Sequence, residues 1–291
     1  MSEALDTLLV LLDLERVEQD VFRGSGRFGV VPRVFGGQVA AQALVAAGRT
    51  VPEDRTPHSL HAYFLRLGDP GTPIEYTVDR VRTGRSFATR QVVAAQHGRR
   101  IFHLTASFQR AEEGLEHQEE MPAAPDPETL PTAAETLPRY ADRFADPRLA
   151  DRVLQAWSAV DLRYVAEPPF GTAGRPREPR SQVWFRTAGK LPDDPLLHAS
   201  VATYISDMTL LDPVLLAHGR GGWAVGDVVG ASLDHAMWFH RPFRADEWLL
   251  YDQRSPSSAG GRAFAQARIF TQNGESAISV AQEGVVRVPR G

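Results

Sequence analysis

The chain has 291 residues, of which 43% are hydrophobic and 23% charged, with a formal net charge of −4 and no cysteine. This length suits two domains of ordinary size, and the composition is that of a globular protein. No basic block stands out, which argues against nucleic acid as a partner. The lack of cysteine excludes disulfides, thiolate metal sites and a cysteine nucleophile.

The N-terminal stretch predicts an amphipathic helix with Leu5, Leu8, Leu9 and Leu12 on one face. Acidic residues stand where a secretory signal needs positive charge, so we expect a cytoplasmic protein. No apolar run approaches the roughly 20 residues that a membrane span requires. A strand at 14–22 follows. The motif GSGRFG comes next and indicates a loop, because no helix opens directly after its third glycine.

The rest of the N-terminal half predicts a buried helix of small apolar residues, then a series of strands. The helix covers 35–47, and the strands cover 58–65, 74–83, 87–96 and 100–109. The last two strands are joined by a short turn at His97 and Gly98, which is typical of a hairpin.

The middle of the chain changes character at residue 112. Residues 112–137 are rich in Pro, Ala and Glu and show no sustained period, so they indicate an exposed linker. Short helices are expected within 138–160. We therefore expect an N-terminal domain at 1–111, a linker at 112–160 and a C-terminal domain at 161–291.

The C-terminal half repeats the plan of strand, helix and further strands. Asp194 and Pro195 form a helix start, as N-cap and first helical residue. The helix is expected to run to Leu216, after strands at 162–166 and 182–187. Four strands follow, at 231–243, 247–255, 262–271 and 276–288, with a hairpin turn at 272–274.

Within that long helix, Asp207 is the carboxylate expected on the buried face. Tyr204, Met208 and Leu211 share its stripe at helical spacing. Burial disfavours the charged form and raises the pKa of a carboxyl group. Such a group is either matched by buried hydrogen bonds or retained for chemistry, and its position alone does not decide between them.

The two halves also match in sequence. The hairpin reads FATRQVVAAQHG in one half and FAQARIFTQNG in the other. Ser59 and Gln109 are separated by 50 residues, and so are Ser232 and Gln282. The chain is therefore interpreted as an internal duplication.

Seven stretches, placed in order across both halves, carry a resemblance to a known family. They are RVFGGQVAAQAL, HSLHAYFLRLGDP, RTGRSFATR, TASFQ, QVWFRTAGKLPDD, SLDHAMWFHRPF and QEGVVR. With these, the chain resembles the acyl-CoA thioesterase II family over nearly its whole length. The resemblance implies an α+β double hotdog fold, with two antiparallel sheets each wrapped on a long central helix and packed as an intrachain pseudo-dimer. It also implies an acyl-CoA substrate, no cofactor or metal, and homo-oligomers.

The resemblance further implies that Asp207, Ser232 and Gln282 activate a water molecule that hydrolyses the thioester. Serine stands where some relatives have threonine, and it keeps the hydroxyl group. These residue types suit the reaction, because an acceptor and two groups that both donate and accept hydrogen bonds can orient a water molecule.

The first half lacks a comparable set. No Asp or Glu occurs between Asp20 and Glu53, so its buried helix carries Gln38 and Gln42 instead. We therefore expect one working site per chain, with the first half supplying walls.

Two rival functions stay open. A hotdog hydratase or dehydratase would need His235 or His240 as part of an Asp/His pair. Asp234 and His235 are adjacent and point to opposite faces of a strand, which favours structural roles. The other rival is a non-catalytic acyl-CoA-binding protein. Arg85, Arg90 and Arg262 are weaker candidates for contacts with the phosphates of coenzyme A.

Overall fold

The computed structural model describes residues 3–26 and 33–289. The loop expected from the motif at 24–29 lies partly outside them. The helices within the described residues are α1 (Glu3–Leu12), α2 (Gly36–Gly48), η1 (Pro127–Thr129), α3 (Ala133–Thr136), η2 (Leu137–Arg143), α4 (Arg148–Trp157), α5 (Pro169–Thr172), α6 (Pro195–Thr209) and α7 (Asp212–Ala217). None of them is long and apolar enough to cross a membrane.

Thirteen strands are found within the same residues, and every strand pair is antiparallel. They are β1 (Glu15–Glu18), β2 (Val21–Gly24), β3 (Arg55–Phe64), β4 (Ile74–Thr83), β5 (Phe87–Gln96), β6 (Arg99–Arg110), β7 (Val160–Tyr164), β8 (Arg180–Thr187), β9 (Val229–Ser232), β10 (Asp234–Phe239), β11 (Leu249–Ala259), β12 (Arg262–Thr271) and β13 (Ser276–Arg287).

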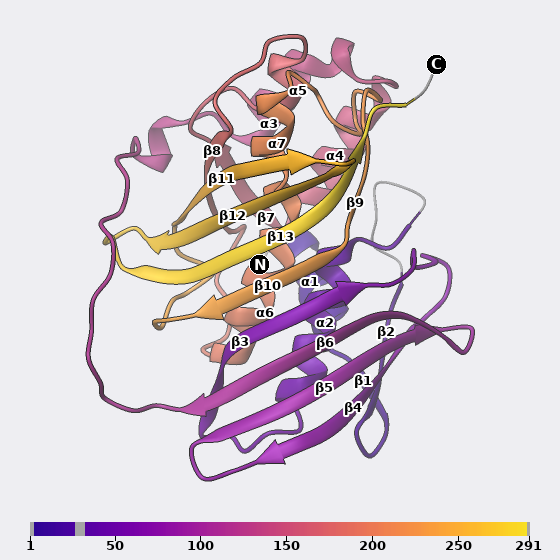
Figure 1. Cartoon of the computed structure of the whole chain (residues 1–291), viewed down its shortest axis with the longest axis vertical. Coiled ribbons are helices and arrows are strands. Elements are labelled where there is room, and N and C mark those ends of the chain that lie inside the picture. The colour runs from indigo at the N-terminus through magenta and orange to yellow at the C-terminus, as the bar shows by residue number, and fades with distance from the viewer. Residues whose placement is uncertain (1–2, 27–32, 290–291) are drawn as a thin grey trace.

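The strands form one continuous sheet, so the expectation of two separate sheets was wrong. Its order is β1-β2-β4-β5-β6-β3-β10-β13-β12-β11-β8-β7, and β9 pairs with β13. The halves join where β3 pairs with β10, from Asp234 opposite Tyr63 to Trp238 opposite Ser59 (Figure 1). An unpaired strand edge exposes N–H and C=O groups. Here the edge strands β3 and β10 pair with each other, so these groups form hydrogen bonds between the two halves.

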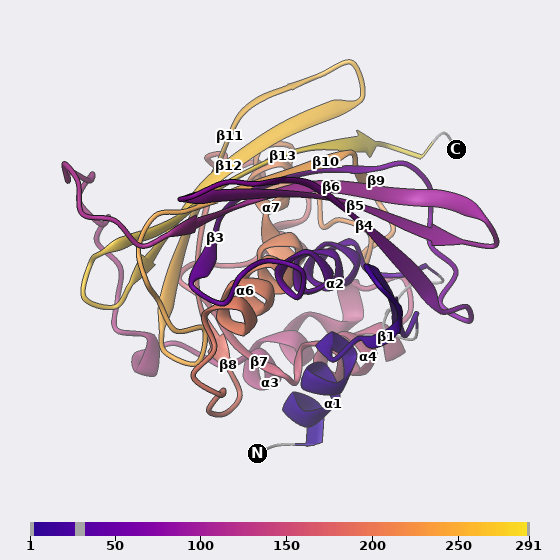
Figure 2. The same ribbon diagram turned by 90° about the horizontal axis from the view of Figure 1, so that it is seen from below.

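Both central helices lie on the concave side of this sheet (Figure 2). α2 consists almost entirely of Gly, Ala, Val, Leu and Gln, and eleven of its residues are buried. The two helices run in opposite directions, because Gly37 of α2 approaches Tyr204 of α6 while Gly48 approaches Leu196. Small residues on α2 permit this close contact between the helices.

Three elements differ from the sequence-based expectation. The long helix is broken after Thr209, and α7 starts at Asp212, because Pro213 has no N–H for the helical hydrogen bond. The single strand expected at 14–22 is two short strands joined at a turn where Asp20 has a φ of 63°. The strand expected at 231–243 is divided between β9 and β10.

The expected linker separates into two parts. Residues 111–126 form neither helix nor strand. The short helices that follow enclose an apolar cluster with α5 and the 218–228 loop, made of Leu137, Phe144, Ala150, Val153, Phe170 and Ala224. Trp157, at the end of α4, packs against both this cluster and the main core. These helices therefore cover one end of the C-terminal half, at the top of Figure 1.

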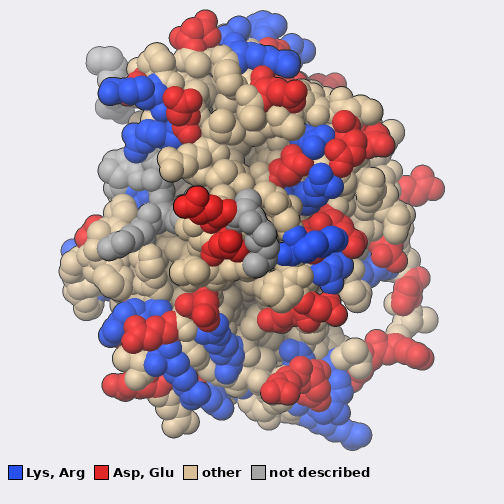
Figure 3. Space-filling view, turned by 180° about the vertical axis from the view of Figure 1, so that it is seen from behind, with Lys and Arg blue, Asp and Glu red and all other residues tan. Residues whose placement is uncertain are grey.

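The rear surface carries basic and acidic side chains interspersed with one another (Figure 3). No large area of this face has a single sign of charge. Such a surface does not provide the concentrated positive field that attracts nucleic acid.

Candidate active site

The last turn of α6 places Asp207 against the first turn of α2. The backbone N–H of Gly37 donates a hydrogen bond to the Asp207 carboxylate. A Cβ atom at Gly36 would lie 2.7 Å from Oδ2 of Asp207. Glycine at position 36 therefore allows the helix terminus and the carboxylate to meet. The partial positive charge at a helix N-terminus also favours an ionised carboxylate there.

Ser232 and Gln282 meet the same carboxylate from the sheet. Ser232 Oγ donates to Asp207 Oδ1 at 3.1 Å, and Gln282 Nε2 donates to the same oxygen at 3.1 Å. Gln282 Nε2 also donates to Ser232 Oγ at 2.7 Å. The structure thus brings together the three residues expected to form the site.

An interruption between two strands positions Ser232. Ser232 pairs with Gly284 in β13, whereas Ala236 pairs with Ala281, so the register changes by one residue between them. Leu233 lies at the interruption, where its N–H bonds Glu283 O and its C=O accepts from Phe64 N–H. This bulge aims the Ser232 side chain at the end of α6.

Burial raises the pKa of Asp207 above its ordinary value. The hydrogen bonds from Gln282, Ser232 and Gly37 and the nearby His235 act in the opposite direction without cancelling the effect of burial. A carboxylate with a raised pKa is a stronger base than a solvated one. Asp207 therefore has the environment expected of a group that accepts a proton.

His235 lies directly behind Gln282, a contact that the sequence-based interpretation missed. Its Nδ1 is 2.6 Å from Gln282 Oε1, and its Nε2 is 2.8 Å from Ser206 Oγ. Since an amide oxygen only accepts, Nδ1 carries the proton and donates to Gln282. Strand alternation turns His235 inward, whereas Asp234 accepts from the backbone N–H of Glu283, so the predicted opposite orientations are confirmed. The sequence predicted only that the two side chains face opposite ways, and the structure adds that His235 is the buried one.

A cavity of about 500 Å³ opens beside Asp207. Tyr204, Met208 and Leu211 line it together with Asp207, as their helical spacing predicted. The wider lining is mostly apolar and comes from both halves, including Phe35, Val39, Phe64, Phe102, Leu137, Phe144, Val153, Trp157, Phe170 and Trp223. A space of this size and character suits a ligand with a hydrocarbon chain.

The first half does not build a second copy of this arrangement. Gln42 donates to Leu11 O at 2.8 Å and accepts from the Tyr76 hydroxyl at 2.7 Å, so its amide is used structurally. Ser59 lies opposite Ser107 in β6, whereas Gln109 lies opposite Thr56. The equal spacing of 50 residues therefore does not reflect equivalent positions at a second site.

Two of the three arginines considered for phosphate contacts have other partners. Arg90 is buried and bonds Thr50, Thr83 and the backbone oxygens of Arg82 and Thr89. Arg262 is paired with Glu283 at 3.0 Å. Two different arginines, Arg33 and Arg66, line the cavity next to Asp207.

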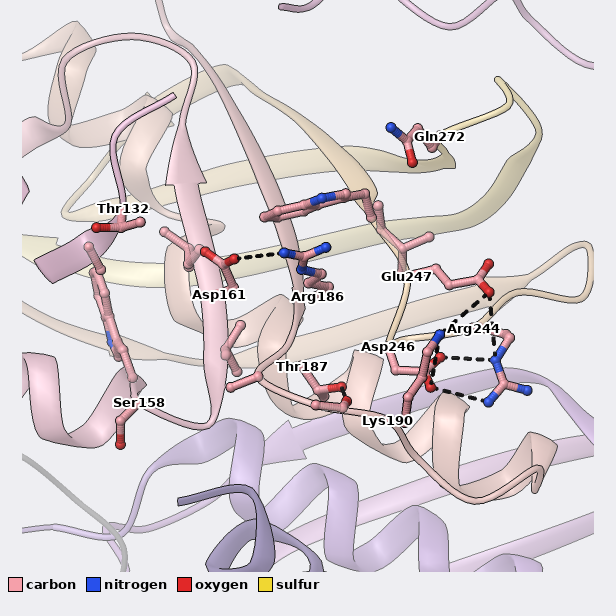
Figure 4. A pocket seen from close by; sticks show the side chains of 18 of the residues that line it. Thr132, Ser158, Asp161, Arg186, Thr187, Lys190, Arg244, Asp246, Glu247 and Gln272 are labelled. Atoms are coloured by element: carbon pink, nitrogen blue, oxygen red, sulfur yellow. Dashed lines mark hydrogen bonds and ion pairs between the residues drawn. The ribbon is translucent and has the colours of Figure 1, made fainter. Parts of the chain in front are cut away.

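A second cavity, of about 720 Å³, lies between the linker helices and the C-terminal strands (Figure 4). Figure 4 shows that its charged groups face one another, with Arg186 paired to Asp161 and Lys190 and Arg244 gathered around Asp246. Trp157 lines this cavity and the one beside Asp207.

Within residues 3–26 and 33–289, no group of three or more His, Cys, Asp or Glu side chains could hold a metal ion.

Comparison with known proteins places both halves of the chain in one family. Residues 25–109 match the profile of the acyl-CoA thioesterase N-terminal domain, and residues 157–285 match the acyl-CoA thioesterase profile. The chain is 42% identical to human acyl-coenzyme A thioesterase 8, over 96% of this chain and 88% of that protein.

The chain belongs to the acyl-CoA thioesterase II family. A solved acyl-CoA thioesterase II from Mycobacterium marinum is 46% identical, with a TM-score of 0.78 over 97% of this chain and 98% of that one. A hot dog protein of unknown function from Alicyclobacillus acidocaldarius, only 20% identical, has a TM-score of 0.77 with full coverage of both chains. This thioesterase therefore has the α+β hotdog fold and hydrolyses acyl-CoA thioesters.

Proposed function

We propose that this thioesterase converts fatty acyl-CoA and water into a free fatty acid and coenzyme A, using Asp207 as the base. Asp207 takes a proton from a bound water, and the oxygen of that water attacks the thioester carbonyl carbon. The carbon–sulfur bond then breaks, and the thiolate leaves. A thiol has an unperturbed pKa of about 8.5, so its thiolate leaves without a strong general acid. The proton held by Asp207 returns to the products or to solvent.

The observation that carries this proposal is the shared contact at Asp207 Oδ1. Ser232 and Gln282 both donate to that oxygen, in the wall of an apolar cavity. These two bonds restrain rotation of the carboxylate, and Oδ2, which takes part in neither of them, is the oxygen proposed to hold the water. Ser232 retains a lone pair that can accept the second hydrogen of that water. Orientation of this kind is a large part of enzymatic rate enhancement.

His235 is proposed to act as a positioning residue. By donating to Gln282 Oε1, it fixes which end of the amide faces the site. The Nε2 end must then point to Asp207 and Ser232, as the distances show. Without this hydrogen bond the amide could reverse, which would present an oxygen to the carboxylate.

The first turn of α2 is proposed to stabilise the negative charge that develops on the carbonyl oxygen. The first N–H groups of a helix have no intrahelical partner. Phe35 supplies no side-chain cap, and because the Gly37 N–H already bonds Asp207, the other N–H groups of this turn are the proposed donors. Backbone donors that are already in place stabilise an oxyanion without reorganisation.

Coenzyme A phosphates are proposed to bind near Arg33 and Arg66. Arg33 donates to the backbone oxygen of Gly230 at 2.9 Å, and Arg66 donates to that of Arg100 at 2.7 Å. Neither forms an ion pair with an acidic side chain in the described part of the chain. Guanidinium groups suit phosphate recognition because their donors match its oxygens.

The chain is also proposed to self-associate, as the family resemblance implied. Tyr63 and Trp238 are 54% and 36% exposed on the central strands of the sheet. Aromatic side chains at the surface are enriched at interfaces between proteins. Sedimentation velocity would give the mass in solution, and a single-chain mass at micromolar concentration would contradict this part.

The dehydratase rival is not favoured. Both ring nitrogens of His235 are held by Gln282 and Ser206. His240 is exposed, and its Nε2 lies 2.9 Å from Ser279 Oγ. Neither histidine has a free nitrogen beside Asp207.

The test is release of free thiol from acyl-CoA substrates of increasing chain length, with wild type and Asp207→Asn compared. The substitution keeps the shape and removes the base. We expect hydrolysis by the wild type and a loss of about 100-fold or more in the variant, the usual size of general-base catalysis. Equal rates in the two proteins would show that the proposed base is wrong. Binding without turnover by the wild type would indicate a non-catalytic acyl-CoA-binding protein.

A further inference from the structure

A second carboxyl group, Asp212, lines the same cavity as Asp207 and has no role in the proposed hydrolysis. It follows Leu210 and Leu211, which join α6 to α7 with helix-like backbone angles. The Tyr164 hydroxyl donates to Asp212 Oδ2 at 2.7 Å, and Tyr164 also lines the cavity. The sequence-based interpretation of this helix overlooked Asp212, because it considered only the stripe around Asp207.

The surroundings of Asp212 and Tyr164 make the binding of an unsubstituted hydrocarbon chain beside them unfavourable. Tyr164 packs edge-on against Phe170, whose ring also contacts Phe144 in the apolar cluster under the linker helices. Within the described residues, Asp212 forms no ion pair. Burial raises the pKa of Asp212 to about 7, although the hydrogen bond from Tyr164 lowers it. Asp212 is half-buried and opens on the cavity, so a hydrocarbon chain that covered it would remove its water and offer it no hydrogen bond.

We propose that Asp212 and Tyr164 form a polar subsite that selects acyl chains bearing a hydroxyl group beyond the carbons next to the thioester. This inference rests on the proposed function, because it assumes that the acyl chain occupies the cavity beside Asp207. Tyr164 uses its proton on Asp212, which leaves the carboxyl group as the acceptor for a ligand hydroxyl. A ligand hydroxyl can donate to the ionised carboxyl group and can also accept from the protonated one. A second carboxylate on the acyl chain would instead meet repulsion.

The spacing along the chain indicates where this hydroxyl lies. Asp212 follows Asp207 by five residues across the break between α6 and α7, and because Leu210 and Leu211 keep helix-like backbone angles the rise is about 7.5 Å at roughly 1.5 Å per residue. The subsite is therefore several carbon–carbon bonds away from the reacting carbonyl. The apolar neighbours of Tyr164 also favour the acyl chain over the polar pantetheine arm as the group that passes it.

The test compares kcat/KM for acyl-CoA substrates of equal length, either unsubstituted or hydroxylated at successive positions along the chain. We expect the wild type to prefer one distal hydroxyl isomer over the unsubstituted chain by about tenfold or more, since a site built for a hydroxyl rejects ligands that lack it. Asp212→Leu should remove this preference and raise kcat/KM for the unsubstituted chain. Asp212→Asn and Tyr164→Phe should weaken the preference for the hydroxylated chain. They replace Asp212→Leu in this test if that variant does not fold.

Tyr76→Phe is the matched control for Tyr164→Phe. It removes a buried tyrosine hydroxyl that bonds Gln42 in the other half, and Tyr76 does not line the cavity. Its substrate preference should equal that of the wild type.

Several outcomes would overturn the subsite while leaving the hydrolysis of acyl-CoA intact. One is a wild type that hydrolyses plain chains and prefers no distal hydroxyl isomer. Another is an unchanged preference in Asp212→Leu. A third is an equal loss for every substrate, which would place the pair at the pantetheine arm. A wild type that hydrolyses none of the substrates would instead contradict the proposed function itself.

Discussion

The two ends of the α2–α6 contact are related by the duplication but hold different residues. Alignment of the first residues of these helices, Gly36 and Pro195, places Gly48 at the position of Asp207. At one end, Gly36 leaves room for the Asp207 carboxylate. At the other end, a Cβ atom at Gly48 would lie 2.4 Å from the Leu196 side chain.

This difference explains how a duplicated fold arrives at one site. Each helix start meets the end of the other helix, so the architecture offers two equivalent places for a carboxylate. In one, a leucine packs on a glycine and closes the space. In the other, the carboxylate borders a cavity. The N-terminal half thus contributes the start of α2 and part of the cavity wall, while the C-terminal half contributes the proposed catalytic groups.

The largest expected effect comes from comparing Gln282→Ala with Gln109→Ala. Gln282→Ala removes a donor to both Asp207 and Ser232, and loss of one such oriented group costs about 100-fold in kcat. Gln109→Ala should retain nearly full activity, because Gln109 pairs with Thr56 and Phe87 and does not line the cavity beside Asp207. Steady-state thiol release measures both. A comparable loss in the two variants would mean that both halves catalyse.

His235 gives a second test of the difference between the two halves, because it forms its hydrogen bond to Gln282 within the C-terminal half. His235→Leu should lower kcat by about tenfold, the value of one net hydrogen bond of roughly 1.4 kcal/mol, with a smaller change in KM. His235→Asn supplies an amide N–H near the position of Nδ1 and should recover part of the loss. If the two variants lost activity equally and also lost thermal stability equally, His235 would have only a packing role.

Alanine at the two glycines tests the two ends of the helix contact directly. Gly36→Ala places a methyl group against the Asp207 carboxylate, so we expect a loss of activity of about tenfold or more from misplacement of the base. Gly48→Ala crowds Leu196 and should cost about 1–3 kcal/mol of stability as overpacking, with activity of the folded protein retained. Thermal unfolding and thiol release on the same samples separate these effects. The reverse pattern would reject the assignment of the two ends.

The pH dependence follows from the raised pKa of Asp207. Only the ionised form accepts a proton, so kcat/KM should rise with pH through an apparent pKa above the ordinary aspartate value of 3.8. Burial lowers the pKa of His235, so His235 is neutral near pH 7 and keeps its bond to Gln282 across this rise. A pH profile of kcat/KM measures this limb. An identical limb in Asp207→Asn would assign the titration to another group.

The smallest expected effect is in the N-terminal half. Tyr76→Phe leaves the buried Gln42 Oε1 without its partner, which costs about 1–3 kcal/mol of stability. Because this pair lies away from the cavity, turnover by the folded protein should be unchanged. Chemical denaturation measures the loss of stability, and thiol release measures the unchanged turnover. A loss of turnover without a loss of stability would connect this polar pair to catalysis.

Local periodicity was enough to predict much of the site. Helical spacing placed Tyr204, Met208 and Leu211 with Asp207, and the structure confirms that all four line one cavity. Strand alternation also predicted that His235 and Asp234 face opposite ways. These patterns depend only on the period of the local backbone, which is about 3.6 residues in a helix and 2 in a strand and can be recognised in the sequence.

Contacts between distant segments were not predictable in the same way. The pairing of β3 with β10 joins the half-sheets through edges that neither half reveals alone. The approach of Gly36 to Asp207 depends on how two helices cross. The break before α7 was different, since Pro213 marks it in the sequence. Ending the helix before Pro213 would also have assigned Asp212 to a different helix from Asp207.

The most direct test of a single site is the binding stoichiometry of a non-hydrolysable thioether analogue of acyl-CoA, measured by isothermal titration calorimetry. The structure predicts one analogue bound per chain, and Gly36→Ala should weaken that binding more than Gly48→Ala does. Two equivalent analogues per chain would contradict the account, because they would require a second open site where Leu196 packs on Gly48.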